Sequence, residues 1–274
     1  MADLPKTITI GDMTVNRLGF GAMRVTGRGV WGDPPDREAA KALLRKVAAS
    51  GVDFFDTADS YGPGISEILI AEALHPYPAG LIIATKGGLV RPGPDRWDAD
   101  CRPASLRAAC EASLKRLRLD RIDLYQLHTV DPQVSIEDSV GTLLELQKEG
   151  KIRHIGLSNV QPEQLRRAQA VAPIVSVQNR YNIDDRFHEK MVDTCTAQGL
   201  AFLPWYPLAA GTLTEDSARL ADIAKRHGAT LAQAALAWLL HRSPMMLPIP
   251  GTSSEAHFLE NLGAASIRLD ADEL

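Results

Sequence analysis

Four side chains that could take part in proton transfer follow successive strands predicted from the sequence. Asp56 and Tyr61 follow the second predicted strand, Lys86 follows the third and His128 follows the fourth. A carbonyl group that receives hydride develops negative charge on its oxygen, so it needs a nearby proton donor. Tyrosine is a weak acid with a pKa of about 10, and a neighbouring ammonium group lowers that pKa. We therefore expect Tyr61 to donate the proton and Lys86 to lower its pKa.

The other two residues would support this pair. Asp56 would hold the lysine in place and keep it charged, since a charge removed from water at the end of an apolar strand needs a partner. Neutral His128 would orient the carbonyl oxygen. Taken singly, each residue has an ordinary explanation: Asp56 as a turn cap, Tyr61 as a loop aromatic and Lys86 as a solvated charge. Their convergence at neighbouring strand ends favours one acid–base unit.

Eight strand-and-helix units supply the elements that must position these groups. Alternating strands and amphipathic helices are typical of parallel strands joined by right-handed crossovers. The predicted strands span residues 17–23, 52–56, 81–85, 122–127, 153–157, 174–178, 201–205 and 245–249. Helices are predicted to begin near Asp36, Pro103, Ser135, Pro162 and Ser253, and two further helical stretches cover residues 216–227 and 231–241.

This alternation predicts an α/β fold, a (β/α)8 TIM barrel, in which reactive groups lie at the carboxyl ends of the strands. A short β-hairpin at residues 7–10 and 13–15 precedes the barrel and would plug its bottom. An open doubly wound sheet is the competing topology, but it rarely needs eight consecutive units without a break in composition. We expect a single domain over residues 1–274, with a long loop at residues 87–101.

Composition excludes several classes of function. The 274-residue chain has a net charge of −4 with interspersed acids and bases, so neither nucleic acid nor an anionic membrane surface is an expected partner. The amino terminus lacks the apolar run of a signal peptide, and the most apolar stretch, residues 231–240, is too short to span a bilayer. Cys101, Cys110 and Cys195 show neither disulfide nor zinc-site spacing, so we expect no metal and a cytoplasmic location.

Several ordered segments resemble the aldo-keto reductase family. Residues 53–62 (DFFDTADSYG) resemble the family signature around its catalytic aspartate and tyrosine. The lysine position is matched by Thr85-Lys86, the histidine strand by residues 121–128 (RIDLYQLH), and the segment after strand five by residues 150–159 (GKIRHIGLSN). The resemblance covers nearly the whole chain, and chance agreement of so many ordered segments is very improbable. It implies an NAD(P)H-dependent oxidoreductase that reduces an aldehyde or ketone to an alcohol.

The resemblance also implies a cofactor site. Ser158, Asn159 and Gln178 would hold the nicotinamide carboxamide, with strand-end capping as their ordinary explanation, and Trp205 would stack against the nicotinamide ring, with a core tryptophan as the alternative. The segment after strand eight would bind phosphate at a helix start. The remaining cofactor positions are Gly21, Met23, Asp56, Tyr206, Pro207, Leu208, Ile249, Gly251, Thr252, Ser253, His257, Glu260 and Asn261.

The residues and the resemblance differ in what they indicate about a preference for NADP over NAD. Family members that prefer NADP place basic residues after strand eight, where this chain has Gly251 and His257. Neither reproduces the charged, two-point contact of a guanidinium with phosphate. NADP(H) is therefore favoured by the resemblance, with NAD(H) as the alternative.

Loops would select a small carbonyl substrate on this scaffold. Arg24, Trp31 and Trp97 are the candidate substrate contacts, and Trp31 is preferred to Trp97. Residues 16–23 and 249–257 resemble a bacterial branch that includes pyridoxal reductases, which makes pyridoxal a candidate substrate. The short segment at residues 209–212 predicts a small clamp over the cofactor. Two alternatives remain: a nucleotide-sensing binding module, and a lyase that forms a Schiff base on Lys86.

Overall fold

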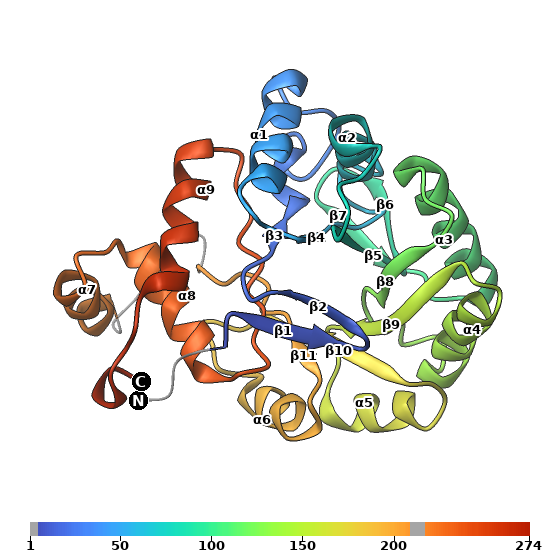
Figure 1. Ribbon diagram of the computed structural model, residues 1–274. Coiled ribbons are helices and arrows are strands. Elements are labelled where there is room, and N and C mark those ends of the chain that lie inside the picture. The colour runs from blue at the N-terminus through green and yellow to red at the C-terminus, as the bar shows by residue number, and fades with distance from the viewer. Residues whose placement is uncertain (1–4, 209–216) are drawn as a thin grey trace.

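The computed structural model describes residues 5–208 and 217–274. Its main sheet is parallel, and its strands follow the order β11-β10-β9-β8-β5-β4-β3. Their bounds are β3 Phe20–Gly21, β4 Phe54–Asp56, β5 Ile82–Gly87, β8 Ile122–Leu127, β9 Ile152–Ser158, β10 Ile174–Gln178 and β11 Ala201–Phe202. The sheet curls into a ring surrounded by helices (Figure 1), which confirms the predicted (β/α)8 barrel.

The barrel closes through a stave that is not a regular strand. We predict a strand at residues 245–249, but this segment makes only an isolated parallel bridge between Phe202 and Met246. Leu247 N donates to Phe202 O at 2.9 Å, and Gly19 N donates to Pro248 O at 3.0 Å. Pro248 and Pro250 have no N–H to donate, so a continuous ladder cannot form here. The first strand is likewise shorter than predicted, because the 3-10 turn Ala22–Val25 follows Gly21.

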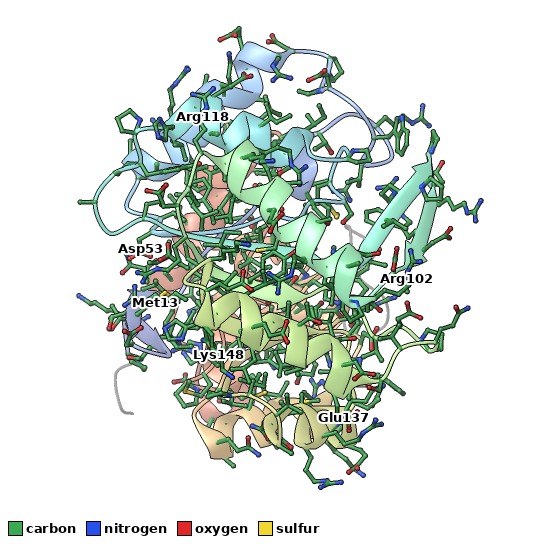
Figure 2. The ribbon with its side chains drawn as sticks, turned by 90° about the vertical axis from the view of Figure 1, so that its right-hand side faces the viewer. Met13, Asp53, Arg102, Arg118, Glu137 and Lys148 are labelled. Atoms are coloured by element: carbon green, nitrogen blue, oxygen red, sulfur yellow. The ribbon has the colours of Figure 1, made fainter. Side chains whose placement is uncertain are left out.

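A hairpin covers one end of the barrel, as predicted. Its strands are β1 Thr7–Ile10 and β2 Met13–Asn16, and the turn between them uses Gly11 at φ +62°. Ile8, Ile10, Met13 and Val15 are buried and pack on side chains inside the barrel. Figure 2 shows Met13 at one end of the molecule.

Nine helices are described around the ring. They are α1 Arg37–Ala49, α2 Ile65–Leu74, α3 Pro103–Leu117, α4 Ile136–Lys148, α5 Pro162–Gln169, α6 Glu189–Gln198, α7 Ser217–Arg226, α8 Leu231–Arg242 and α9 Glu255–Leu262. Asp36 and Ser135 cap α1 and α4 by accepting backbone N–H bonds, as their residue types predict. The cap of α9 is Ser254 rather than the predicted Ser253. None of the described helices is long and apolar enough to cross a membrane.

A second hairpin rises from the opposite end of the barrel. Residues 87–101 contain β6 Leu89–Gly93 and β7 Arg96–Ala99, so the prediction of a loop here is wrong. The strands pair Leu89 with Ala99 and Val90 with Asp98, and Asp95 takes a positive φ of 58° in the turn. Figure 2 shows this hairpin at the end near Arg102, away from Met13. The predicted clamp at residues 209–212 lies outside the described residues.

Candidate active site

A pocket of about 470 Å³ opens at the carboxyl ends of the barrel strands. Sixteen of its lining residues are ones that the sequence analysis proposes for catalysis, cofactor or substrate. They are Gly21, Met23, Arg24, Asp56, Tyr61, Trp97, His128, Ser158, Asn159, Gln178, Trp205, Tyr206, Pro207, Leu208, Ile249 and Gly251. Leu89 of the second hairpin and Pro250 also line the pocket, and sequence reasoning did not propose them.

The remaining proposed residues lie outside this lining. Lys86 lies beneath the pocket floor and is fully buried. Thr252, Ser253, His257, Glu260 and Asn261 lie in and before α9; His257 is exposed, whereas Asn261 is 6% exposed. Trp31 is half-buried in the loop before α1. The pocket therefore gathers the strand-end residues, and the α9 residues are not part of its lining.

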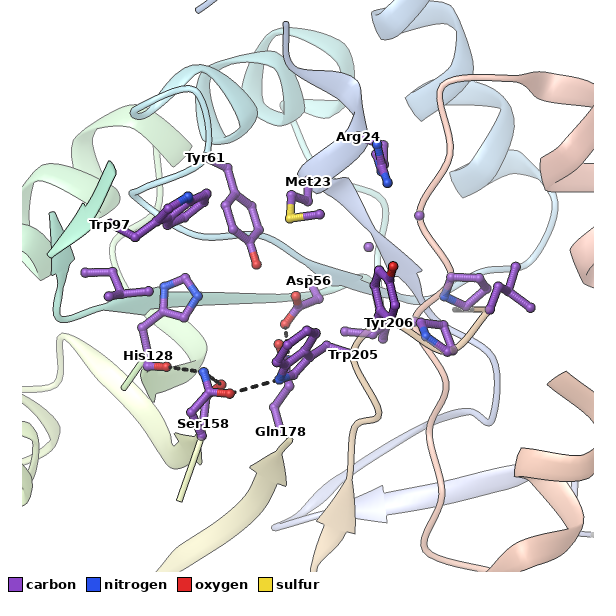
Figure 3. A pocket seen from close by; sticks show the side chains of 18 residues that line it. Met23, Arg24, Asp56, Tyr61, Trp97, His128, Ser158, Gln178, Trp205 and Tyr206 are labelled. Atoms are coloured by element: carbon purple, nitrogen blue, oxygen red, sulfur yellow. Dashed lines mark hydrogen bonds between the residues drawn. The ribbon is translucent and has the colours of Figure 1, made fainter. Parts of the chain in front are cut away.

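Lys86 links the acid and the phenol that precede it in the chain. Asp56 ends β4 and Lys86 lies in the neighbouring β5, so parallel pairing brings the two side chains to the same end of the sheet. Lys86 Nζ donates to Asp56 Oδ1 at 2.6 Å, to Thr57 O at 2.8 Å and to Tyr61 Oη at 3.4 Å. One buried ammonium thus contacts both the carboxylate and the phenol. Figure 3 shows Asp56 and Tyr61 among the side chains that line the pocket.

The Asp56 carboxylate accepts two further hydrogen bonds. Gln126 Nε2 donates to Oδ2 at 3.1 Å, and Gln178 Nε2 donates to the same oxygen at 2.8 Å. Gln126 is fully buried on β8, two residues before His128, and sequence reasoning missed it. Its sequence signals are a polar side chain between Tyr125 and Leu127 and its place inside the quoted segment at residues 121–128. These amides help to stabilise the negative charge that faces Lys86.

Burial and charge set the protonation states. Burial acts to lower the pKa of Lys86, but the Asp56 and Tyr61 side chains raise it, and the net pKa lies above the usual value. Burial raises the pKa of Tyr61 and outweighs the opposing effect of Lys86. The sequence analysis expected Lys86 to lower this pKa, but the net pKa lies above the usual value. A lysine kept charged in this way is a poor nucleophile, which opposes the Schiff-base alternative.

His128 is held as a neutral ring. Burial lowers its pKa well below the usual range, and the Lys86 charge adds to the effect. The Nδ1 atom lies 3.3 Å from Ser60 Oγ, and the ring meets Tyr61 edge to face at 5.7 Å between centroids. Ser60 is buried and was also missed by the sequence analysis, although it lies inside the quoted segment at residues 53–62. A neutral imidazole can donate through one nitrogen while the other accepts.

Asn159 joins neighbouring strand ends. Its Nδ2 donates to His128 O at 2.9 Å and to Ser158 Oγ at 3.2 Å, while its Oδ1 accepts from Trp205 Nε1 at 3.0 Å. The residue adopts a positive φ of 58°, a conformation that asparagine tolerates. Its amide is therefore committed to holding the Trp205 ring at the pocket wall.

The two candidate tryptophans differ in position. Trp97 lines the pocket and meets the Tyr61 ring edge to face at 6.4 Å, whereas Trp31 does not line it. Figure 3 places Trp97 beside Tyr61 on one side, with Trp205 and Tyr206 on the other. Trp97 is therefore the tryptophan that lines the pocket, whereas Trp31, which the sequence analysis preferred, lies outside this lining. Sequence spacing gave no sign of this, because the second hairpin was not predicted.

The remaining thiols and carboxylates make no metal cluster among the described residues. Cys101, Cys110 and Cys195 are free and buried, and burial raises the pKa of each thiol to about 12. At neutral pH these thiols are therefore protonated and unreactive.

Comparison with known proteins matches this architecture to one family. The model of the Aldo/keto reductase family matches residues 17–274. An uncharacterized oxidoreductase of Schizosaccharomyces pombe is 49% identical over 266 residues, covering 97% of this chain and 87% of the relative. Pyridoxine 4-dehydrogenase of Escherichia coli is 44% identical over 274 residues, covering 98% of this chain and 96% of the relative.

Solved structures agree with the sequence relatives. A thermostable aldo-keto reductase bound to the inhibitor epalrestat superposes with a TM-score of 0.87 at 32% identity, over 97% of this chain and 96% of that one. An aldo-keto reductase from Klebsiella pneumoniae in complex with NADPH superposes with a TM-score of 0.84 at 28% identity. This match covers 100% of this chain and 93% of that one. The chain therefore belongs to the aldo/keto reductase family and is an NAD(P)-dependent oxidoreductase.

Proposed function

We propose that this protein reduces an aldehyde or ketone to an alcohol with NADP(H) as cofactor, and that Tyr61 supplies the proton. One observation carries the proposal: buried Lys86 Nζ contacts both Asp56 Oδ1, at 2.6 Å, and Tyr61 Oη, at 3.4 Å, beneath the pocket. An ammonium group at this place stabilises the phenolate that remains once the proton has left. Asp56 holds the ammonium group and keeps it charged.

His128 would orient the substrate oxygen toward Tyr61. When the Ser60 hydroxyl donates to Nδ1, the ring proton lies on Nε2, which can then donate to a carbonyl oxygen. Two donors, Tyr61 Oη and the imidazole N–H, would then share the charge that develops on that oxygen. The low pKa of His128 supports this role, because a protonated ring would compete with Tyr61 as the acid.

The residues present fit a nicotinamide dinucleotide, which supplies the hydride when bound. Gly21 and Gly251, which both line the pocket, let their segments approach closely: a Cβ added to Gly21 would lie 2.6 Å from Ile249 O, and one added to Gly251 would lie 2.4 Å from Gly21 O. The Gln178 Nε2 atom is committed to Asp56, which leaves its Oε1 as an acceptor for a carboxamide N–H. Trp205 and Tyr206 offer ring surfaces, and Ser158 offers a hydroxyl.

Arg24 fits the cofactor better than the substrate. Figure 3 places it on the side of Tyr206, across the pocket from Trp97. An exposed guanidinium there can pair with a phosphate group. We therefore propose it as a cofactor contact.

NADP(H) is proposed over NAD(H) on the strength of the relative solved with NADPH. Residues 251–257 contain neither lysine nor arginine, so the 2′-phosphate would depend on other groups. Lys46 of α1 lies near this corner, 3.5 Å from Glu255 at the start of α9. Oxidation rates with NADPH and NADH at equal concentration measure the preference directly.

Pyridoxal is the proposed substrate candidate, because an E. coli relative is named pyridoxine 4-dehydrogenase. Figure 3 places Trp97 across the pocket from Trp205, where its ring can pack against a flat substrate, and Leu89 also lines the pocket. Oxidation of NADPH with pyridoxal, compared with a panel of other aldehydes, tests this choice.

The deciding experiment replaces Tyr61 with phenylalanine. Tyr61→Phe should lower kcat by about 10²–10⁴-fold, because the proton donor is lost, while the Kd for NADPH stays the same. The matched control is Tyr125→Phe: Tyr125 is fully buried on β8, and its hydroxyl has no hydrogen-bond partner among the described residues. This control should keep its activity. Full activity in Tyr61→Phe would refute the mechanism, and NADPH binding without turnover by the unmodified protein would favour the sensing module.

A further inference from the structure

Arg91 joins three loops around the pocket through its buried guanidinium group. The side chain projects from β6 and is 8% exposed. Nε donates to Arg96 O at 2.9 Å, Nη1 to Val30 O at 3.0 Å and Ser60 O at 3.3 Å, and Nη2 to Gly29 O at 3.3 Å. These carbonyls belong to the second hairpin, the loop before α1 and the loop that carries Tyr61. One side chain thus ties together segments that are far apart in the sequence.

The same guanidinium lies against both candidate tryptophans. Its central carbon is 3.6 Å from the ring centroid of Trp97 and 5.4 Å from that of Trp31. A guanidinium over an indole face gains cation–π attraction, which is stronger where water is excluded. Trp97 in turn meets Tyr61 edge to face at 6.4 Å. Although Trp97 is 38% exposed, its ring is held from the side of Arg91.

We infer that Arg91 is a positioning residue that fixes Trp97 beside Tyr61, and that the wall so formed selects flat aromatic carbonyl compounds over aliphatic ones. The inference rests on the proposed reduction and adds a substrate class to it. A ring fixed in advance costs little conformational entropy when a flat substrate packs against it. An aliphatic chain gains less from the same surface, because it cannot stack on it.

Only an arginine can make this set of contacts. The planar guanidinium presents its donors in a fixed fork and stacks on an aromatic face, whereas an ammonium group is a compact, strongly hydrated charge. The acceptors named above are all backbone carbonyls, so replacing the arginine leaves the same acceptor groups in the chain. Lysine at position 91 is therefore expected to restore part of the charge contact but not the fork.

The test compares Arg91→Met with the matched control Arg96→Met. Arg96 lies on the same hairpin, but its side chain pairs with Asp98 at the surface. With saturating NADPH, Arg91→Met should raise KM for 4-nitrobenzaldehyde by about tenfold, within the range expected for a lost cation–π contact and a loosened ring. Its kcat/KM for butanal should stay within about threefold, and Arg91→Lys should fall between the two proteins. Arg96→Met should match the unmodified protein with both aldehydes.

A double-substitution series identifies Trp97 as the group through which Arg91 acts. Trp97→Ala should raise KM for 4-nitrobenzaldehyde, and adding Arg91→Met to it should then change KM by less than about twofold, because the two effects share one route. Additive effects, or an equal loss with both aldehydes, would overturn the inference. If Arg91→Met does not fold, the same comparison is made with Arg91→Lys. Its effect on KM for 4-nitrobenzaldehyde should likewise disappear when Trp97→Ala is also present.

Hydrogen exchange tests the anchoring without turnover. Amides in residues 29–31 and 89–99 should exchange faster in Arg91→Met than in Arg96→Met, because the guanidinium no longer links the two loops. Unchanged exchange would contradict the positioning role. If the unmodified protein reduces neither aldehyde, the proposed function has failed. If it reduces both aldehydes, and Arg91→Met changes the two reactions equally or not at all, the inference alone has failed.

Discussion

At the scale of single residues, the site depends on one buried charge. Lys86 is fully buried, and a lysine in such a place is stable only when a carboxylate and further acceptors compensate it. Asp56 and the Thr57 carbonyl provide that compensation at 2.6 Å and 2.8 Å. The resulting ammonium contacts Tyr61, so charge compensation and the proposed chemistry use the same three groups.

The pH profile of reduction follows from the Tyr61 phenol. Burial keeps its pKa above the usual value, so the proton that it must donate stays bound through neutral pH. We expect kcat for reduction to be constant from about pH 7 to 9 and to fall only above about pH 10. A steady-state profile with NADPH and a saturating aldehyde measures this. A loss of rate centred near pH 7 would contradict the assignment of the donor.

Asp59 provides a second prediction that depends on pH. Its Oδ1 is buried and has no hydrogen-bond partner among the described residues. Burial, together with the nearby Glu67 charge, raises its pKa to about 8 from 3.8. The folded protein therefore holds this proton more tightly than the unfolded chain does. Its contribution to stability is present below about pH 4 and is lost as pH rises toward 8.

Asp59→Asn should remove this dependence. Relative to the unmodified protein, the free energy of unfolding of the variant should increase between pH 5 and pH 8, because the asparagine has no proton to lose. Urea unfolding at both values measures the change, and the exposed Asp120→Asn serves as control. A difference between variant and parent that is the same at pH 5 and pH 8 would contradict the raised pKa.

At the scale of elements, hydrogen bonds from a side chain help to close the barrel where the backbone hydrogen-bond ladder of its sheet is incomplete. The stave at residues 245–249 lacks a regular ladder, and Arg17 compensates for part of it. Arg17 is 4% exposed; its Nη2 donates to Leu240 O at 2.8 Å and Ser243 O at 2.5 Å, and its Nε donates to Met246 O at 3.3 Å. It therefore connects the chain before β3 to the end of α8 and to the closing stave.

Replacing Arg17 should loosen this closure. Arg17→Met should lower the free energy of unfolding by about 2–4 kcal/mol, since three buried carbonyls lose their donor. Lys6→Met, an exposed substitution nearby, should change it by less than about 0.5 kcal/mol. Urea titration followed by circular dichroism gives both values. Equal stability of Arg17→Met and its parent would show that the stave closes without this residue.

At the scale of the whole molecule, the two ends of the barrel have different roles. The first hairpin packs on the barrel interior at one end, and the second hairpin, at the opposite end, supplies Leu89 and Trp97 to the pocket wall (Figure 2). Barrel enzymes separate a stability face from a reactive face in this way. The cofactor would span the reactive face from the Trp205 wall toward α9.

Cofactor binding should stabilise the whole chain. NADPH at one hundred times its Kd should add about 2.7 kcal/mol to the free energy of unfolding, because only the folded barrel binds it. Thermal unfolding with NADPH and with NADH at equal concentration measures the two effects. The larger increase in Tm is expected with NADPH, and an equal or larger increase with NADH would contradict the proposed preference. This readout does not depend on turnover.

The sequence by itself determined the features that depend on local pattern. Strand and helix periodicity specified the barrel, and the positions of Asp56, Tyr61, Lys86 and His128 after successive strands placed them at one end of it. Parallel strands put their carboxyl ends at the same rim, so chain order was enough to predict that these side chains meet.

Only the tertiary structure decided what depends on contacts between distant segments. The net pKa of Tyr61 required the balance between burial and the Lys86 charge. That Trp97 rather than Trp31 lines the pocket depends on the second hairpin, and on the contact of Arg91 with the Trp97 ring. Gln126 and Ser60 became visible as site residues only through their hydrogen-bond partners. The burial of a single polar side chain, and its contacts with segments distant in the sequence, produce no local periodicity. A sequence pattern therefore does not predict them.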